Sequence, residues 1–331
     1  MIDMLDHLSI KRIDWQKPRA EGISYIVDKF QGFDNENFKI ISPHIDMVKI
    51  YGALPLMISD DQLAKRISFY HDYNILVSVG STLTEYALLE KSFDTYVEDV
   101  HRLGFDIIEI GENNIELSIE KKKQISEKLF SKNLKPLWKI GKKDPRRQMS
   151  FDQTVAKINE ALDVGSEKIL LEGNLGYAVS IYDEKGNIKW NVVGAVTSKI
   201  SPNRIIFETP LEIQQSALIA EFGQRVNLGE INLDNVMSIE SQRKGFLSRS
   251  SYGISSMKKI AKGSPATKFI YYVIKTRNSM EQSDLINITN LPRRTVQTGL
   301  EELKEQGLIV EKTNLDDIRK KIYQIVSDEW I

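Results

Sequence analysis

The stretch Ile75-Leu76-Val77-Ser78-Val79-Gly80-Ser81-Thr82-Leu83-Thr84-Glu85 decides the fold class of this 331-residue chain. Its first five residues predict a buried β-strand, and Gly80 marks the turn that ends it. The hydroxyls and the carboxylate that follow are typical of the first turn of a helix. In a parallel α/β protein, the free N–H groups of such a helix start face an anion, and glycine lets the anion approach closely. Gly80, Ser81 and Thr82 are therefore predicted to bind a phosphate or carboxylate group.

The same strand-to-helix pattern recurs along the chain from residue 22 to residue 245. Amphipathic segments, such as 93–103 closed by Gly104, predict helices between the strands. Eight such units match a (β/α)₈ barrel, and the continuous apolar strands are typical of a parallel sheet buried on both faces. An open doubly wound sheet is the alternative, but the count of eight and the polar residues at the strand ends favour closure. The predicted strands are 23–27, 47–50, 75–79, 107–110, 134–140, 169–171, 205–207 and 226–228.

Composition excludes several classes of protein. The net charge of -1 predicts no general attraction to nucleic acid or membrane. The chain has no cysteine, which excludes disulfides, thiolate nucleophiles and Cys-based metal sites. Residues 1–6 have neither a basic start nor a long apolar core, and we find no stretch long and apolar enough to span a membrane. We therefore expect a cytoplasmic protein.

Charged side chains follow nearly every predicted strand. In a closed barrel the carboxyl ends of the strands meet at one mouth. Lysines gathered there would bind a di-anion, and carboxylates would hold a divalent metal. The alternative is that these residues are charged because strand ends meet solvent. The residues concerned are Asp28, Lys29, Lys49, Glu85, Glu109, Glu112, Lys139, Lys142, Lys143, Glu172, Glu208 and Glu230.

An ordered set of motifs between residues 17 and 245 resembles the phosphosulfolactate synthases. The resemblance implies a (β/α)₈ barrel that adds sulfite to phosphoenolpyruvate with Mg²⁺, an early step towards coenzyme M, and it makes the chain a lyase that forms a carbon–sulfur bond. The motifs are Lys17-Pro18-Arg19, Val27-Asp28-Lys29, Asp46-Met47-Val48-Lys49, Gly80 to Glu85, Leu103 to Ile110, Gly141-Lys142-Lys143-Asp144, Phe207-Glu208-Thr209-Pro210, Val226 to Ile231, and Glu240 with Arg243.

The resemblance also implies roles for individual residues. A lysine would deliver the proton that completes the addition, and the candidates are Lys142 and Lys143. Side chains that would bind phosphate and carboxylate groups are Arg19, Lys29 and Lys49. Carboxylates that would bind Mg²⁺ are Asp28, Glu109 and Glu172. The alternative is that these residues form ion pairs at the rim of the barrel.

Some positions depart from the family pattern. Lys139 stands where the family usually has a glutamate, which reverses the charge at that site. After Glu172 the family's Ala-Arg-Glu-Ser-Gly has become Gly173-Asn174-Leu175-Gly176, which removes an arginine suited to binding phosphate. A changed substrate or a lost reaction is therefore an open alternative.

The composition changes after residue 245. Serine- and glycine-rich runs predict a barrel domain over 1–250, a linker over 251–263 and a second domain over 264–331. Pro265 begins a predicted helix, two further helical segments follow, and residues 310–325 predict a hairpin. This order resembles the winged-helix modules of MarR-type regulators.

In a winged helix, the third helix enters the major groove and the hairpin meets phosphates. The resemblance therefore implies DNA binding by Arg293, Arg294, Thr295, Gln297, Thr298, Arg319, Lys320 and Lys321. Winged helices also serve as protein-interaction modules, which is the alternative.

Two functions from different classes follow. In the first, the barrel is an enzyme acting on a small anionic substrate, and the second domain supports dimerisation or regulation. In the second, the chain is a one-component regulator in which a diverged barrel senses a small anionic effector and the winged helix binds double-stranded DNA.

Overall fold

The computed structural model describes residues 17–30, 32, 34–173, 178–245, 263–277, 279–313 and 321–325. The chain divides into two compact units, Met1–Gly253 and Ile254–Ile331. The predicted linker 251–263 lies outside the described residues except for Gly263.

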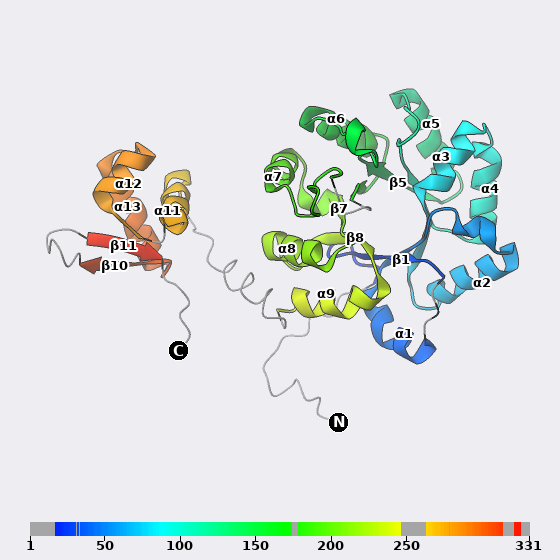
Figure 1. Ribbon diagram of the computed structural model, residues 1–331, viewed down its shortest axis with the longest axis horizontal. Helices are drawn as coiled ribbons and strands as arrows, with labels where there is room; N and C mark the ends of the chain where they lie inside the picture. Colours follow the sequence, from blue (N-terminus) through cyan, green and yellow to red (C-terminus); the bar gives the residue numbers. More distant parts are fainter. Residues whose placement is uncertain are drawn as a thin grey trace. The chain divides into compact units, whose positions relative to one another are not determined.

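The first unit is a closed barrel of eight parallel strands (Figure 1), which confirms the predicted closure. Each strand pairs with its neighbour in sequence, and β8 returns to pair with β1. Most strand bounds agree with prediction to within one residue, but β8 begins one residue later and extends to Ile231. The strands are β1 Ser24–Asp28, β2 Met47–Ile50, β3 Leu76–Val79, β4 Ile107–Ile110, β5 Lys135–Ile140, β6 Ile169–Leu171, β7 Ile205–Glu208 and β8 Asn227–Ile231.

Helices surround the barrel on the outside (Figure 1). Helix α4 illustrates why they form: Phe93, Val97 and Val100 recur on one buried face, and Gly104 ends the helix in a left-handed conformation with φ 94°. The helices are α1 Asn35–Ile41, α2 Asp60–His71, α3 Ser81–Leu89, α4 Phe93–Leu103, α5 Ile119–Phe130, α6 Phe151–Asp163, α7 Trp190–Lys199, α8 Glu212–Phe222 and α9 Val236–Arg243.

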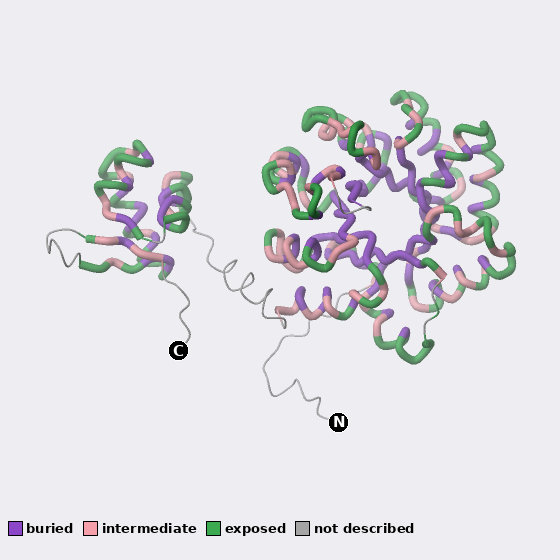
Figure 2. The backbone as a smooth tube through the Cα atoms, viewed as in Figure 1, coloured by how far each residue is buried: buried purple, intermediate pink, exposed green. Residues whose placement is uncertain are grey.

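Burial is greatest in the strands (Figure 2). One apolar cluster fills the layer between the strands and the helices, and a smaller one fills the interior of the barrel. The interior cluster contains Ile23, Met47, Ile107, Leu137 and Ile206, which lie at or near the amino ends of their strands. The polar side chains inside the barrel are therefore concentrated towards the carboxyl ends.

The second unit has its own core. Its described residues form three helices and a three-stranded antiparallel sheet in the order β10-β11-β9. Leu285, Val296 and Leu300 contribute buried side chains from the second and third helices. Its elements are α11 Pro265–Arg277, β9 Ser279–Glu281, α12 Gln282–Thr289, α13 Arg293–Glu305, β10 Ile309–Thr313 and β11 Lys321–Ile325.

This order of helices and hairpin agrees with the predicted layout, and the assignment to the winged-helix class stays a prediction. In the described part of the chain, no helix is long and apolar enough to cross a membrane.

Candidate active site

The carboxyl ends of the strands bring together most of the predicted site residues around a cavity of about 180 Å³. We call this cavity the mouth. Five predicted residues line it together with Glu109: Lys49, Gly80, Ser81, Thr82 and Lys143. Tyr51, Gly52 and Lys139 complete the lining. Since catalytic sites of (β/α)₈ enzymes lie at this end of the barrel, the mouth is the candidate active site.

Lys49 is at the centre of a network that crosses the barrel interior. Its ammonium group lies 3.2 Å from Glu109 Oε1 and 3.5 Å from Glu208 Oε1, and it also pairs with Glu230. These partners come from β4, β7 and β8, while Lys49 comes from β2. The lysine is 3% exposed, so its charge is balanced by carboxylates rather than by water.

A second buried ammonium group, that of Lys139, lies between two carboxylates. It is 2.7 Å from Glu208 Oε1 and 3.1 Å from Glu172 Oε2. Burial by itself would lower the pKa of Lys139, but the nearby carboxylates outweigh that effect and raise the pKa. Burial raises the pKa of Glu172, whereas Lys139 and Lys49 outweigh burial at Glu208 and lower its pKa. Lys139 is therefore a permanent cation beside two carboxyl groups that differ in acidity.

Glu109 is held on several sides. The hydroxyl of Tyr25 donates a hydrogen bond of 2.6 Å to its Oε1, and the Ser81 N–H donates one of 3.3 Å to its Oε2. Tyr25 also hydrogen-bonds to Ser78. The start of α3 was predicted to face a ligand anion, and one of its N–H groups instead reaches a carboxylate of the protein itself.

Tyr25 and Ser78 were missed as members of this network by sequence reasoning. Both are polar residues within otherwise apolar parallel strands, and both are fully buried. Ser78 lies two residues before Gly80, so strand alternation places the two on the same face. That spacing is the signal that could have identified Ser78.

Glu85 shapes the loop after β4. Its carboxylate accepts hydrogen bonds from the backbone N–H groups of Asn113 and Asn114, at 2.9 and 3.0 Å, and from both side-chain amides. A Cβ at Gly111 would lie only 2.7 Å from Glu85 Oε1, so any larger residue would have to displace this carboxylate. Asn113 in turn accepts a hydrogen bond from the Lys143 backbone N–H. Glu85 thus positions the chain beside the mouth.

Lys142 and Lys143 point to different places. Lys143 lines the mouth, and within the described residues its ammonium group forms no ion pair. Lys142 donates hydrogen bonds to the carbonyl of Glu112 and to Glu116 Oε1, and it lines a separate cavity of about 280 Å³. Of the two predicted proton donors, Lys143 alone lines the mouth.

Two predicted residues lie elsewhere. Asp28 does not join Glu109 and Glu172, contrary to the prediction of one metal site. It is the last residue of β1, and its carboxylate accepts hydrogen bonds from Arg66 and Tyr70 of α2, both at 2.7 Å. The strand extends one residue beyond the predicted end at Val27, and alternation along it turns the Asp28 side chain outward.

Arg19 lies at the opposite end of the barrel. Its guanidinium group pairs with Asp46 and Glu240, each at 2.9 Å, near the amino end of β1. These contacts link the segment before β1 to α9. We therefore leave Arg19 out of the mouth and assign it a structural role.

Lys29 lies at the rim. It is exposed, and its ammonium group lies 5.2 Å from the centre of the Tyr51 ring. Since Tyr51 lines the mouth, Lys29 is within reach of an anion arriving from solvent.

The carboxylates of the mouth do not fit a magnesium site as they are arranged. Mg²⁺ requires oxygen ligands in near-octahedral geometry. Glu109 and Glu172 are each paired with a lysine. Among the described residues, no group of three or more His, Asp or Glu side chains is placed to hold a metal ion.

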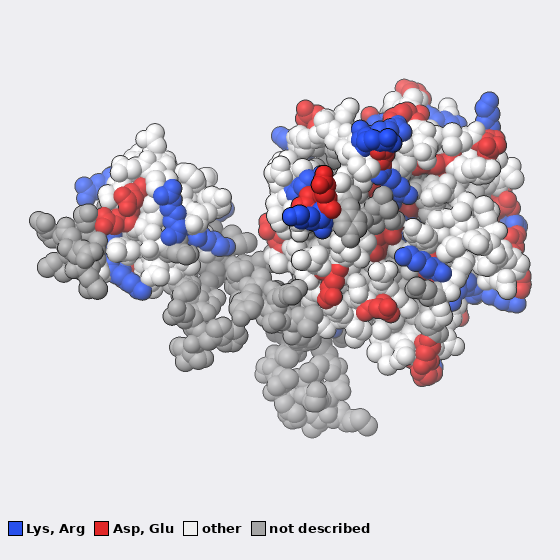
Figure 3. All heavy atoms as spheres, in the orientation of Figure 1, with Lys and Arg blue, Asp and Glu red and all other residues white. Residues whose placement is uncertain are grey.

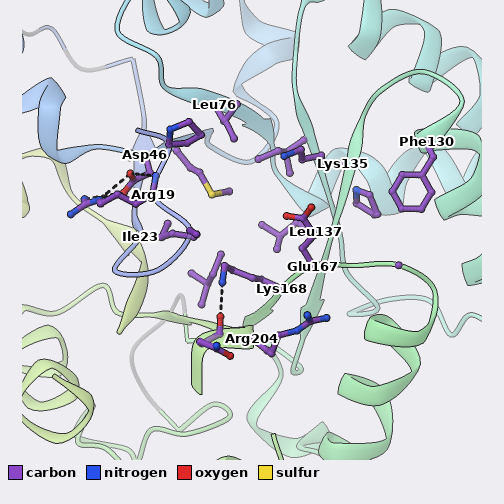
Figure 4. A pocket seen from close by; sticks show the side chains of 18 residues that line it. Arg19, Ile23, Asp46, Leu76, Phe130, Lys135, Leu137, Glu167, Lys168 and Arg204 are labelled. Atoms are coloured by element: carbon purple, nitrogen blue, oxygen red, sulfur yellow. Dashed lines mark hydrogen bonds and ion pairs between the residues drawn. The ribbon is translucent and has the colours of Figure 1, made fainter. Parts of the chain in front are cut away.

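A larger cavity, of about 560 Å³, lies at the amino end of the barrel (Figure 4). Its floor is apolar and includes Ile23, Leu76 and Leu137, and Lys135 and Arg204 add positive charge. Size alone would favour this cavity. We favour the mouth because its ammonium groups converge and because this fold places its chemistry at the carboxyl ends.

Elsewhere, positive and negative side chains are interspersed over the face of the barrel unit in view (Figure 3). That mixture agrees with the net charge of -1. Attraction of an anionic substrate must therefore come from the cationic side chains at the site itself.

In the second unit, α13 exposes the predicted DNA-binding face. Arg293, Arg294, Gln297 and Thr298 are exposed, and Thr295 is half-buried. Lys321 is exposed and pairs with Glu311. Arg319 and Lys320 lie outside the described residues.

Comparison with known proteins decides the family. Residues 14–249 match the family model of (2R)-phospho-3-sulfolactate synthase (ComA). The chain belongs to this family. The phosphosulfolactate synthase of Methanocaldococcus jannaschii is 31% identical over 229 residues, which cover 68% of this chain and 91% of that protein. That of Methanothermobacter thermautotrophicus is 31% identical over 235 residues, covering 69% and 91%. The Bacillus subtilis phosphosulfolactate synthase is 28% identical over 240 residues, covering 70% and 93%.

Membership of the family confirms the prediction that the barrel is that of an enzyme. The match ends at residue 249, so the second unit lies outside it.

Proposed function

We propose that the barrel adds sulfite, or a related nucleophile, to phosphoenolpyruvate or a similar small phosphorylated acid. The observation that carries this proposal is the convergence of Lys49, Lys139 and Lys143 on one cavity at the carboxyl ends of the strands. A substrate with phosphate and carboxylate groups needs several cationic groups facing one cavity. Membership of the phosphosulfolactate synthase family supports the same chemistry.

In the proposed reaction, the sulfur lone pair forms a bond to the terminal enol carbon of phosphoenolpyruvate. The electron pair of the double bond moves to the adjacent carbon and is shared with the carboxylate. A proton transferred to that carbon completes the addition, and no group leaves. Lys143 is our proposed proton donor, because it lines the mouth and its ammonium group forms no ion pair with the described residues.

Buried cations stabilise the charge that develops on the carboxylate. Lys49 and Lys139 are fixed by ion pairs, so they need no reorganisation when that charge appears. Lys29, at the rim, and the residues Gly80 and Thr82 at the start of α3 would bind the phosphate, since the Ser81 N–H already donates to Glu109. Mg²⁺, which the family resemblance implies, enters none of these steps, because Glu109 and Glu172 are already paired with lysines.

The direct experiment follows the phosphorus-31 NMR signal of phosphoenolpyruvate when the full chain and sulfite are added. We expect a new phosphate-ester signal in the phosphorus-31 spectrum and loss of the vinyl signals in the proton spectrum. Unchanged spectra with folded protein, with and without Mg²⁺, would remove this function.

A second candidate function, DNA binding by the second unit, is favoured by one observation. Helix α13 exposes Arg293, Arg294 and Gln297 on one surface, while Val296 and Leu300 are buried. Arginine and glutamine are suited to reading base edges. An enzyme that also binds DNA, or a regulator whose barrel senses the same anion, would both use this surface.

A further inference from the structure

The mouth, together with the ion-pair network around Lys49 and Lys139, contains more carboxylates than a site for anions would ordinarily hold. Glu109, Glu172, Glu208 and Glu230 are each at most 6% exposed. Buried carboxylates need a cation nearby, because desolvation otherwise makes their ionised form costly. A divalent metal is one way to supply that cation.

Here lysines supply it. Glu208 lies 2.7 Å from the Lys139 ammonium group and 3.5 Å from that of Lys49, so one carboxylate links the two cations. The Lys139 ammonium group lies between the carboxylates of Glu208, the last residue of β7, and Glu172, which follows β6. A divalent metal held by these two carboxylates would need the oxygens that Lys139 already contacts. The Lys139 side chain is 2% exposed and is not free to swing into solvent.

A metal arriving at this place would meet repulsion from fixed positive charges. Two ammonium groups already occupy the space among the carboxylates, and like charges at such distances disfavour one another. Glu109 is held by the Tyr25 hydroxyl, the Ser81 N–H and Lys49. Rebuilding these contacts into octahedral coordination would break several buried interactions at once.

We infer that the ammonium group of Lys139 takes the place of a divalent metal in this barrel, so that the mouth binds and polarises its anionic substrate without Mg²⁺. Lys139 is then a further substrate-binding residue, whose fixed charge stabilises the substrate carboxylate as the electron pair moves onto it. This inference rests on the proposed function for the identity of the substrate. The ion pairs from which we argue it are independent of that function.

The test uses Mn²⁺ as the probe, followed by electron paramagnetic resonance on the full chain. We expect the wild-type mouth to bind Mn²⁺ no more tightly than about 1 mM, the weak end of protein sites. Lys139→Glu removes one cation and adds one carboxylate, so it should bind Mn²⁺ at least about tenfold more tightly. Lys139→Met, which removes the cation and adds no ligand, is the matched control, and its affinity for Mn²⁺ should rise less than that of Lys139→Glu.

A wild-type chain that binds one Mn²⁺ tightly, and loses it in Glu172→Gln, would overturn the inference. That result needs no turnover, so it is independent of the proposed reaction. If Lys139→Glu does not fold, the wild-type titration and Lys139→Met still decide. Rates of sulfite addition test the role of Lys139 in catalysis. The wild-type rate should persist in EDTA, and the rate of Lys139→Met should be lower by about 100-fold or more. Turnover that stops in EDTA and returns with Mg²⁺ would contradict the inference, whereas absence of turnover under all conditions would count against the proposed function only.

Discussion

Lys142 and Lys143 are adjacent in sequence, yet their side chains line different cavities. The Lys142 ammonium group is held 2.9 Å from Glu116, while that of Lys143 lines the mouth. The family resemblance alone left both lysines open as proton donors. Their placement makes a different prediction for each.

Lys143→Ala should lower the rate of sulfite addition by about 100-fold or more, because it removes the proposed proton donor. Lys142→Ala should retain most of the rate, because it removes a contact to the loop after β4. Initial rates of phosphoenolpyruvate consumption measure both. Full activity in Lys143→Ala would show that another group delivers the proton.

Binding of sulfate to the mouth should strengthen as the pH falls from 7.5 to 5.5. Burial raises the pKa of Glu172 to about 6. Below that pH the mouth loses a negative charge, so an anion meets less repulsion. The same raised pKa means that Glu172 favours the folded state more as the pH falls from 6 towards its unfolded value. Sulfate has no titration in this range, so calorimetric titration reports the protein alone. Glu172→Gln should flatten the pH profile, and an unchanged slope would exclude Glu172 as its source.

Gly141→Ala should destabilise the barrel by about 1–3 kcal/mol. Gly141 has φ 136°, and an added Cβ would lie 2.2 Å from the Cβ of Glu172. Gly194→Ala is a matched control, since Gly194 lies in α7 with no atom within 4 Å of an added Cβ. The control should be neutral or slightly stabilising, because alanine is the better helix former. Thermal unfolding monitored by circular dichroism compares the two. Equal melting temperatures would show that the turn after β5 adjusts freely.

If the second unit binds DNA, Arg294→Ala should weaken that binding by about 1–3 kcal/mol. Fluorescence anisotropy with DNA from upstream of the chain's own gene measures the effect. Lys275→Ala removes an equal charge from an exposed position of α11 and should have little effect. An equal loss of DNA affinity in both variants would indicate general attraction to phosphates rather than recognition by α13.

Sequence reasoning reached the barrel because its signals are local and repeated. A run such as 107–110, followed by a turn and an amphipathic helix, is specified by residues close together in the chain. The mouth is different, because Lys49 and Glu208 are 159 positions apart and meet only once the barrel closes.

The outward turn of Asp28 and the separation of Lys142 from Lys143 depend on side-chain direction at a strand end. A single residue of uncertainty in where the strand stops reverses that direction. Lys139 was visible in the sequence as a reversed charge, but its place between Glu172 and Glu208 needed the structure.

A crystal structure of the chain soaked with phosphoenolpyruvate would locate the substrate site. We expect the ligand in the mouth, with its phosphate and carboxylate groups against Lys143, Lys49 or Lys139 and the start of α3. Phosphoenolpyruvate bound instead in the larger cavity at the amino end, beside Lys135 and Arg204, would contradict this expectation.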